Sequence, residues 1–237
     1  HKDLEMRQNV QQGVTVYEYS RHEGDFHADN VRIENGTIHF DFVSPVENVA
    51  DIELGQPVPI NIENSVAAMA LAQLNGCSAD ELRNGMRTYA GVDRRFDFKI
   101  KNDRHVFLSD YAHHPKEILQ SAKSLKEIYP NRKVTVIFQP HLYTRTRDFY
   151  QEFADALSHF DEVVLTEIYP AREEPIPGVS SALIFENLKE GVERRMILKD
   201  EVIDFVKEHD FDVLVVLGAG NLDNYVPEIA EILKGKE

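Results

Sequence analysis

The sequence predicts an α/β fold, with a doubly wound, mostly parallel sheet that follows a smaller α+β segment. From Phe96 onward, short apolar runs alternate with amphipathic segments, which is the rhythm of strands and helices in a parallel sheet. Before that point, alternating apolar residues surround the pair Asn35-Gly36, a strong hairpin signal. These patterns place a domain boundary near residue 95. The second domain, about 140 residues long, has a common domain size.

The first part is expected to hold an antiparallel patch and then two helices. Residues 14–19 alternate as a strand, and apolar positions alternate around the Asn-Gly turn over residues 26–42. The Ala-rich segment 61–74 predicts a helix, and Ser78 with Glu81 forms a capping-box pattern for a second one. Because it shows no parallel core, this part is expected to be an incomplete domain.

The second part is expected to alternate strands and helices. The predicted strands are 106–108, 134–138, 162–166, 196–198 and 213–217, and the predicted helices lie near 116–129, 147–159, 180–190, 200–208 and 223–234. The right-handed crossover rule places the carboxyl ends of parallel strands at one edge of the sheet, where α/β folds carry their chemistry. We therefore expect four loops to converge there: 110–115, 138–146, 169–174 and 218–221.

The composition is that of a soluble protein with an acidic surface. The chain has 237 residues, of which 42% are hydrophobic and 28% charged, and its formal net charge is −15. This charge argues against nucleic acid or an anionic membrane as the main partner. No apolar run approaches the roughly 18 residues of a membrane span, and no secretion leader is recognised. The single Cys77 cannot form an internal disulfide. We therefore expect a cytoplasmic protein.

Residues 110–115, DYAHHP, lie between a predicted strand and a predicted helix. They bring together a carboxylate, a phenol and two imidazoles. Such side chains can bind carboxylates or amines and can transfer protons. The plainer alternative is an Asp that caps a helix beside surface histidines. This segment alone leaves both interpretations open.

Three segments in this order, AGVDRRF at 90–96, DYAHHP at 110–115 and FQPHLYTRT at 138–146, resemble motifs of the Mur ligases. The resemblance covers nearly the whole chain. It implies that residues 96–237 form the Rossmann-like C-terminal domain of such a ligase and that residues 1–95 are the end of its central ATP-binding domain. The phosphate-binding pattern GxxxxGK[ST] is absent from the sequence. The P-loop and the magnesium ligands are therefore expected upstream, and this chain alone is expected to be inactive.

The resemblance implies an ATP-dependent carboxylate–amine ligase of peptidoglycan synthesis, with ATP and Mg²⁺ as cofactors. Within the family, the match is to members that join L-alanine to UDP-N-acetylmuramate through an acyl phosphate. Catalysis would consist mainly of positioning and charge neutralisation around the phosphoryl group. The expected partners are these small molecules, and the oligomeric state is left open.

The resemblance also implies a nucleotide site. In the family, two asparagines near the start of an Ala-rich helix lie close to the adenine, a guanidinium from the domain junction reaches the nucleotide, and an Asp at a strand end contacts the ribose. The residues that match are Asn61, Asn64, Arg95 and Asp110. Two alternatives stay open: Asn61 could cap a helix, and Arg95 or Arg94 could form an interdomain ion pair. Ile60 stands where His is usual in the family.

The resemblance places the amino-acid substrate at the loops that follow two of the strands. Arg145 would hold the carboxylate of L-alanine by a bidentate pair, and His141 would orient its loop. Leu142 stands where many relatives have a second Arg, and Arg147 could replace that Arg. The expected substrate-binding residues are Tyr111, His113, His141 and Arg145, and the expected catalytic residues are His113, His114 and Arg145.

Three alternatives stay open. The first is a related ligase that attaches murein tripeptide in cell-wall recycling; it shares the first two motifs and usually differs at the third. The second is a non-catalytic α/β module that binds a nucleotide or a partner. The third is a metal-dependent hydrolase built on His113, His114 and His141, although two adjacent histidines are not a zinc pattern by themselves.

Overall fold

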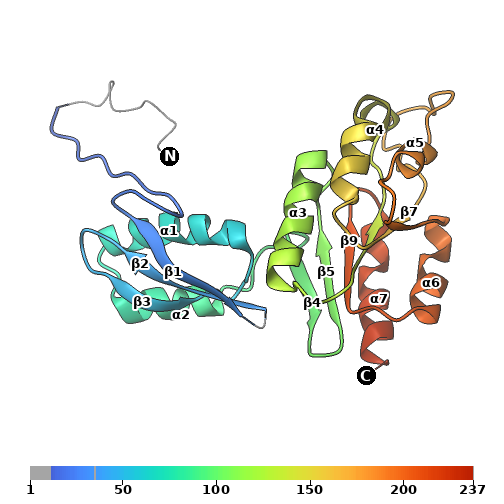
Figure 1. The fold of residues 1–237 in the computed structure, drawn as a ribbon. Coiled ribbons are helices and arrows are strands. Elements are labelled where there is room, and N and C mark those ends of the chain that lie inside the picture. Colours follow the sequence, from blue (N-terminus) through green and yellow to red (C-terminus); the bar gives the residue numbers. More distant parts are fainter. Residues whose placement is uncertain (1–11, 35, 237) are drawn as a thin grey trace. The chain divides into compact units, whose positions relative to one another are not determined.

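The computed structural model describes residues 12–34 and 36–236 (Figure 1). The chain divides into two compact units, His1–Gly91 and Val92–Glu237. The assignment of the first unit to a central ATP-binding domain stays a prediction. Among the described residues, no helix is both long enough and apolar enough to cross a membrane.

The first unit is a three-stranded antiparallel sheet with two helices. The strands β1 (His27–Glu34), β2 (Thr37–Val43) and β3 (Val49–Glu53) lie in this order, and α1 (Pro59–Leu74) and α2 (Ala79–Thr88) follow them in the chain. Alternation along β2 buries Ile38, Phe40 and Phe42. These side chains share one core with Ile62 and Met69 of α1, so the apolar sheet face and the helices stabilise each other.

Two local predictions for this unit are confirmed. β1 and β2 form a hairpin with Glu34 opposite Thr37, although Asn35 of its turn lies outside the described residues. The capping box is present, because the Ser78 hydroxyl accepts the amide N–H of Glu81 and the Glu81 carboxylate accepts that of Ser78. The turn and the capping box are readable because their own contacts, Glu34 with Thr37 and Ser78 with Glu81, join residues three apart in the sequence.

The strand predicted at residues 14–19 is wrong. The segment forms no ladder, and only Tyr19 makes an isolated bridge, with Phe26. Val14 and Val16 are 58% and 40% exposed, so the alternating side chains have no core to enter. Strand formation depends on this burial and on a neighbouring strand more than on intrinsic preference.

The second unit is a six-stranded sheet with helices on both faces (Figure 1). Its strands are β4 (Asp97–Lys101), β5 (Val106–Asp110), β6 (Val134–Phe138), β7 (Glu162–Leu165), β8 (Glu193–Met196) and β9 (Val213–Leu217). Their spatial order is β4-β5-β9-β6-β7-β8, and each neighbouring pair is parallel except β4 with β5. The central strands are almost completely buried, as in sheets covered on both faces. The predicted doubly wound, mostly parallel sheet is confirmed.

The helices of this unit lie on opposite faces of the sheet. They are α3 (Pro115–Ile128), α4 (Tyr143–Leu157), α5 (Ala182–Glu186), α6 (Val202–Glu208) and α7 (Val226–Lys234), with 3₁₀ turns η2 (Lys199–Glu201) and η3 (Leu222–Tyr225) before the last two. α6 and α7 pack on the face that carries Phe107, Ile137 and Leu214. α4 packs on the other face, where the rings of Phe153 and Phe138 have centroids 5.6 Å apart, and α3 contacts α4.

The strand order creates a topological switch point. β9 lies between β5 and β6, yet the helix that follows it packs on the face opposite to α4. The loops after these neighbouring strands therefore leave the sheet in opposite directions. Doubly wound sheets bind their ligands at such a point, outside the carboxyl ends of the strands.

Several elements of this unit differ from the predicted ranges, and α4 begins at Tyr143 instead of near 147. β4 is an antiparallel edge strand that the β-α rhythm does not predict, because most of its side chains are only partly buried. β8 covers Glu193–Met196 instead of 196–198, and its exposed side chains give no apolar signal. α5 is limited to Ala182–Glu186, within the predicted range 180–190.

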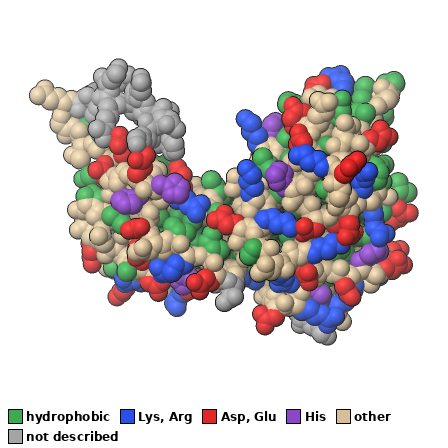
Figure 2. All heavy atoms as spheres, viewed as in Figure 1, with side chains coloured by type: hydrophobic (Ala, Val, Ile, Leu, Met, Phe, Trp, Pro, Cys, Tyr) green, Lys and Arg blue, Asp and Glu red, His purple; other side chains and the backbone are tan. Residues whose placement is uncertain are grey.

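On the face of this unit seen in Figure 2, acidic and basic side chains are interspersed, without a continuous basic surface there.

Candidate active site

The loops that follow the parallel strands meet at the carboxyl edge of the second unit's sheet. The Gly218 amide, after β9, donates to the carbonyl oxygen of Asp110 at the end of β5 (3.2 Å). The Leu142 amide, after β6, donates to the carbonyl oxygen of Tyr169, after β7 (3.0 Å). The predicted convergence of the four loops is confirmed, and it follows from the parallel order of the strands.

Asp110 anchors the loop after β5. One carboxylate oxygen accepts the Phe96 amide N–H (3.3 Å), and the other accepts the Ser121 hydroxyl of α3. Burial raises the pKa of Asp110, although these hydrogen bonds and the nearby Arg95 oppose that rise. Because the carboxylate contacts α3 through Ser121 instead of its first turn, Asp110 is not the cap of this helix. Its contact with a ribose stays a prediction.

Glu117 holds the two histidines of this loop from the first turn of α3. Its carboxylate accepts the amide N–H groups of His113 (3.0 Å) and His114 (3.1 Å). Partial burial disfavours the charged form, but these amides and the nearby His113 and Arg95 outweigh it and lower the pKa of Glu117. Glu117 was not among the predicted site residues; it occupies the third position of α3, where a Glu is a capping signal.

The hydrogen bonds of His113 determine which ring nitrogen is available. Its Nδ1 lies 2.9 Å from the Tyr111 carbonyl oxygen and 3.4 Å from the Glu117 carboxylate. A carbonyl oxygen only accepts, so the Nδ1 atom carries the proton. In the neutral ring, Nε2 then has a free lone pair and can accept a hydrogen bond from an amine.

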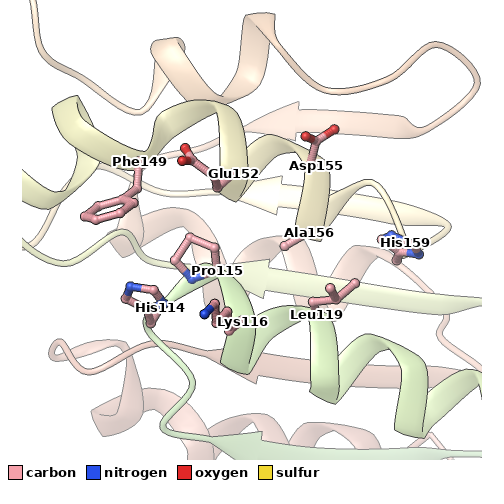
Figure 3. Close-up of a pocket in the computed structure, with 9 residues that line it drawn as sticks. All are labelled: His114, Pro115, Lys116, Leu119, Phe149, Glu152, Asp155, Ala156 and His159. Atoms are coloured by element: carbon pink, nitrogen blue, oxygen red, sulfur yellow. The ribbon is translucent and has the colours of Figure 1, made fainter.

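His114 lies in a different environment from His113. Its ring contacts Phe149 of α4, with centroids 5.3 Å apart. Both residues line a pocket of about 320 Å³ between α3 and α4, together with Leu119 and Ala156 (Figure 3). His113 instead pairs with His141, whose ring centroid is 6.2 Å away. The structure therefore brings His113 and His141 together and places the His114 ring in the pocket between the helices.

Two guanidinium groups lie over the ring of Tyr111. The Arg94 and Arg95 groups are 4.8 Å and 5.3 Å from its centroid. Arg94 forms an ion pair with Asp223 (3.0 Å) and donates to the Gly218 carbonyl oxygen (3.3 Å). Within the part of the chain that the structure describes, Arg95 forms no ion pair. Arg94 therefore has internal anionic and carbonyl partners, whereas Arg95 lies near the Asp110 and Glu117 carboxylates without forming an ion pair among the described residues.

His141, just before α4, lies close to Arg145 in the first turn of that helix. The Arg145 Nη1 atom is 3.4 Å from the His141 Nδ1 atom, and the His141 ring stacks on Tyr169 with centroids 5.7 Å apart. Burial lowers the pKa of His141, and the positive charge of Arg145 lowers it further. A guanidinium only donates, so Nδ1 accepts and the neutral imidazole carries its proton on Nε2.

The loop after β7 holds the start of α4. The Glu173 carboxylate accepts the Thr144 amide N–H (3.0 Å) and the Thr144 hydroxyl, and these two hydrogen bonds lower the pKa of Glu173. Leu142, just before the helix, has φ +73°, a conformation that side-chain-bearing residues rarely adopt. Tertiary hydrogen bonds from the neighbouring loop therefore keep the Arg145 turn in place.

Other expected residues lie outside this cluster. Arg147 is exposed and pairs with Asp148 (2.7 Å), and its role as a second carboxylate-binding Arg stays a prediction. In the first unit, Asn61 donates to the Gln56 carbonyl oxygen (3.4 Å), and Asn64 donates to Asn61 (3.3 Å). α1 begins at Pro59, so Asn61 is not its cap. The nucleotide contacts of both asparagines stay predictions.

The hydrolase alternative receives no support from this geometry. Among the described residues, no group of three His, Cys, Asp or Glu side chains is arranged to hold a metal ion. His113 and His141 are close, but His114 contacts Phe149 instead of joining them.

Gln139 and Gly220 complete the edge and were missed by the sequence reasoning. The buried Gln139 side chain accepts the Leu222 amide N–H (3.1 Å) and donates to the Asn221 side chain (3.2 Å). A Cβ atom at Gly220 would lie 2.2 Å from the Gln139 Oε1 atom and 2.9 Å from the Tyr169 Cβ atom. The only sequence signal is the Gly218-Ala219-Gly220 turn, whose close packing is visible only in the fold.

The chain is similar to a set of bacterial ligases. It is 58% identical over 235 residues to a UDP-N-acetylmuramate–L-alanine ligase of Phocaeicola vulgatus, a match that covers 99% of this chain and 51% of the relative. It is 52% identical to the corresponding ligase of Parabacteroides distasonis, covering 98% and 50%. The chain thus spans about half the length of the curated relatives it matches.

Solved structures share the fold. The crystal structure of a UDP-N-acetylmuramate–alanine ligase from Thermotoga maritima matches 92% of this chain and 48% of that chain, with a TM-score of 0.75 and 24% sequence identity. A murein peptide ligase from Psychrobacter arcticus matches 91% of this chain and 45% of that chain, with a TM-score of 0.55 and 16% identity.

A family model described as "Mur ligase, glutamate ligase domain" matches residues 94–220, the segment that carries DYAHHP, FQPHLYTRT and the Gly218 turn. This match covers more than half of the chain and contains His113, His141 and Arg145 of the cluster described above. The chain belongs to the Mur ligase family.

Proposed function

We propose that the protein carrying this chain joins L-alanine to UDP-N-acetylmuramate in an ATP-dependent reaction of peptidoglycan synthesis. The observation that carries the proposal is the cluster of His113, His141 and Arg145 at the carboxyl edge of the sheet. It offers a guanidinium for a carboxylate and, from the His113 Nε2 atom, an acceptor for an amine. These are the two functional groups of an α-amino acid.

The reaction needs activation because a free carboxylate is a poor electrophile. ATP supplies it by phosphorylating the lactyl carboxylate of UDP-N-acetylmuramate, and the amine of L-alanine then displaces phosphate to form the amide. The contribution of this chain is to position the amine and its carboxylate, which makes the attack effectively intramolecular. ATP and UDP-N-acetylmuramate are cytoplasmic metabolites, so we place the enzyme in the cytoplasm.

The amino-acid carboxylate would be held by one guanidinium in this protein. Arg145 lies beside the neutral His141 ring, Leu142 carries no charge, and Arg147 is paired with Asp148 on the surface. An Arg–carboxylate pair is directional and often bidentate, so a single Arg can fix the carboxylate plane. His113 would then accept a hydrogen bond from the amine.

The nucleotide would be contacted through Arg95, whose guanidinium is stacked on Tyr111 and forms no ion pair within the described residues. This group fits an anionic phosphate. Asn61 and Asn64 would lie near the adenine, and Asp110 near the ribose. For Mg²⁺, the described residues offer no set of three acidic or imidazole ligands, so its ligands are expected elsewhere in the protein.

The test is phosphate release by the full-length protein, encoded with its native upstream sequence. The assay contains magnesium, ATP and UDP-N-acetylmuramate, with either L-alanine or murein tripeptide as acceptor. Release that depends on L-alanine supports the proposal. Release only with tripeptide assigns the protein to cell-wall recycling, and release with neither favours a non-catalytic module.

A further inference from the structure

Arg94 connects three segments of the second unit. Its guanidinium forms an ion pair with Asp223 of η3 (Nε to Oδ1, 3.0 Å) and donates to the carbonyl oxygen of Gly218, after β9 (3.3 Å). The same group lies over the Tyr111 ring, 4.8 Å from its centroid. The Tyr111 amide in turn donates to the Arg94 carbonyl oxygen (2.8 Å). Arg94 thus links its own segment to the loops after β5 and β9.

The backbone around Arg94 adopts a conformation that surrounding contacts must hold in place. Arg94 has φ +58° and Phe96 has φ +48°, both in the left-handed region that side-chain-bearing residues rarely adopt. Residues persist in such conformations when the surrounding structure holds them there. The Asp97 carboxylate accepts the Arg94 amide N–H (3.1 Å), and Asp223 supplies a charged partner for the Arg94 side chain.

Asp223 lies in a turn that hydrogen bonds to Gln139 hold in place. Just before it, the Leu222 amide donates to the buried Gln139 side chain (3.1 Å), which also donates to Asn221 (3.2 Å). The loop after β9 is therefore held by Gln139 on one side and contacts Arg94 on the other. A carboxylate on such a turn can determine where the guanidinium lies.

Tyr111 contacts two other groups of the site, so its position affects where they lie. Its ring contacts Arg95, 5.3 Å from the centroid, and His113, with ring centroids 5.1 Å apart. Its carbonyl oxygen accepts the His113 Nδ1 hydrogen bond, which orients the Nε2 lone pair. A displacement of Tyr111 would therefore move both a nucleotide contact and an amino-acid contact.

We propose that Asp223 is a positioning residue of the ligase. By holding Arg94, it fixes the Tyr111 ring, and through Tyr111 it orients Arg95 and His113 toward their substrates. Asp223 itself does not touch a substrate. The substrate assignments in this inference rest on the proposed function, whereas the contact chain from Asp223 to Tyr111 does not.

The first test compares Asp223→Asn with the matched control Glu228→Gln in the full-length protein. Both variants remove one carboxylate near the start of α7, but Glu228 is exposed and is not among the contacts of Arg94. For Asp223→Asn we expect KM for L-alanine and for ATP to rise about fivefold, with kcat changed by less than about twofold. Glu228→Gln is expected to keep both KM values. Equal effects of the two variants would overturn the proposal.

A double-mutant cycle tests whether Asp223 acts through Arg94. The variants are Asp223→Asn, Arg94→Gln and the combination of both. Non-additive KM changes, with the double variant similar to Arg94→Gln alone, support the proposal. Additive changes would overturn it. Because the Asp223 and Arg94 side chains are only 31% and 29% exposed, breaking their ion pair is expected to lower stability as well, so KM is measured well below the unfolding temperature of every variant.

Amide hydrogen exchange separates this inference from the proposed function. The Tyr111 amide is expected to exchange faster in Asp223→Asn than in the wild type, because its acceptor is the Arg94 carbonyl oxygen. If the wild type releases no phosphate with either acceptor, the proposed function fails, while faster Tyr111 exchange still supports the positioning role. An unchanged Tyr111 exchange rate in Asp223→Asn overturns the positioning role whatever the activity.

Discussion

The imidazole rings of His113 and His141 lie 6.2 Å apart between centroids, although 28 residues separate them in the chain. The Nδ1 atom of His113 donates to the Tyr111 carbonyl oxygen, and the Nδ1 atom of His141 accepts from Arg145. The two rings therefore present opposite hydrogen-bonding properties at Nε2: His113 an acceptor and His141 a donor. This pair, with Arg145, is the basis of the first two predictions below.

Replacing Arg145 with Ala is expected to raise KM for L-alanine. A charge-assisted hydrogen bond contributes about 1.5–3 kcal/mol, which corresponds to a change of about 10- to 100-fold. Arg147→Ala is the matched control, since Arg147 is exposed and pairs only with Asp148. Steady-state kinetics of the full-length protein measure both variants. Equal KM values for Arg145→Ala and wild type would show that the carboxylate is held elsewhere.

The titration of His141 should report on its distance from Arg145. Burial and the Arg145 charge lower the pKa of His141, so the neutral form is favoured in the folded protein. The stability that depends on neutral His141 is present above the unfolded pKa and is lost as the pH falls through the lower, folded pKa. In Arg145→Gln, the His141 pKa measured by NMR is expected to rise part of the way toward its usual value.

Arg147→Gln serves as the control for this titration, because its charge lies at the surface beside Asp148. It should leave the His141 pKa nearly unchanged. A His141 pKa that stays constant in Arg145→Gln would contradict the contact between the two side chains.

Asp110→Asn should change how stability depends on pH. Burial raises the pKa of Asp110, so its contribution to stability is fully present below the unfolded pKa and is lost as the pH rises through the folded pKa. Relative to Asp110→Asn, the wild type should therefore become more stable as the pH falls from neutral toward 4. Urea denaturation at several pH values measures the difference. Asp204→Asn, which removes an exposed carboxylate from α6, is the control for the change of charge itself.

Gly220→Ala is expected to destabilise the second unit by about 1–3 kcal/mol, the usual cost of overpacking. The new Cβ atom would lie 2.2 Å from the Gln139 Oε1 atom, so the Gln139 side chain must move away from the loop after β9. Gly85→Ala, within α2, is the control: its Cβ atom would meet nothing within 4 Å. That helical substitution should be neutral or stabilising by up to about 1 kcal/mol. Denaturant unfolding compares the two variants, and an unaffected Gly220→Ala would contradict the close packing.

Structural features could be predicted from the sequence where they depend on nearby residues or on the burial of a continuous apolar run. The Ser78 capping box involves residues three apart, and the apolar runs of β5, β6 and β9 reflect burial on both faces. The strand predicted at 14–19 failed for the opposite reason, because its alternating pattern needs a neighbouring strand, and the described residues provide only an isolated bridge from Tyr19 to Phe26.

The sequence by itself determined the α/β class, the parallel sheet and the convergence of four loops, because strand order along the chain and the crossover rule place carboxyl ends together. It also supplied His113, His141 and Arg145 through motifs. Only the tertiary structure decided that the His114 ring lies against Phe149, while His113 faces His141. The tertiary structure also shows that Arg94 pairs with Asp223, whereas Arg95 has no ion pair among the described residues. These contacts join residues far apart in the chain, and their direction depends on side-chain packing that no local pattern encodes.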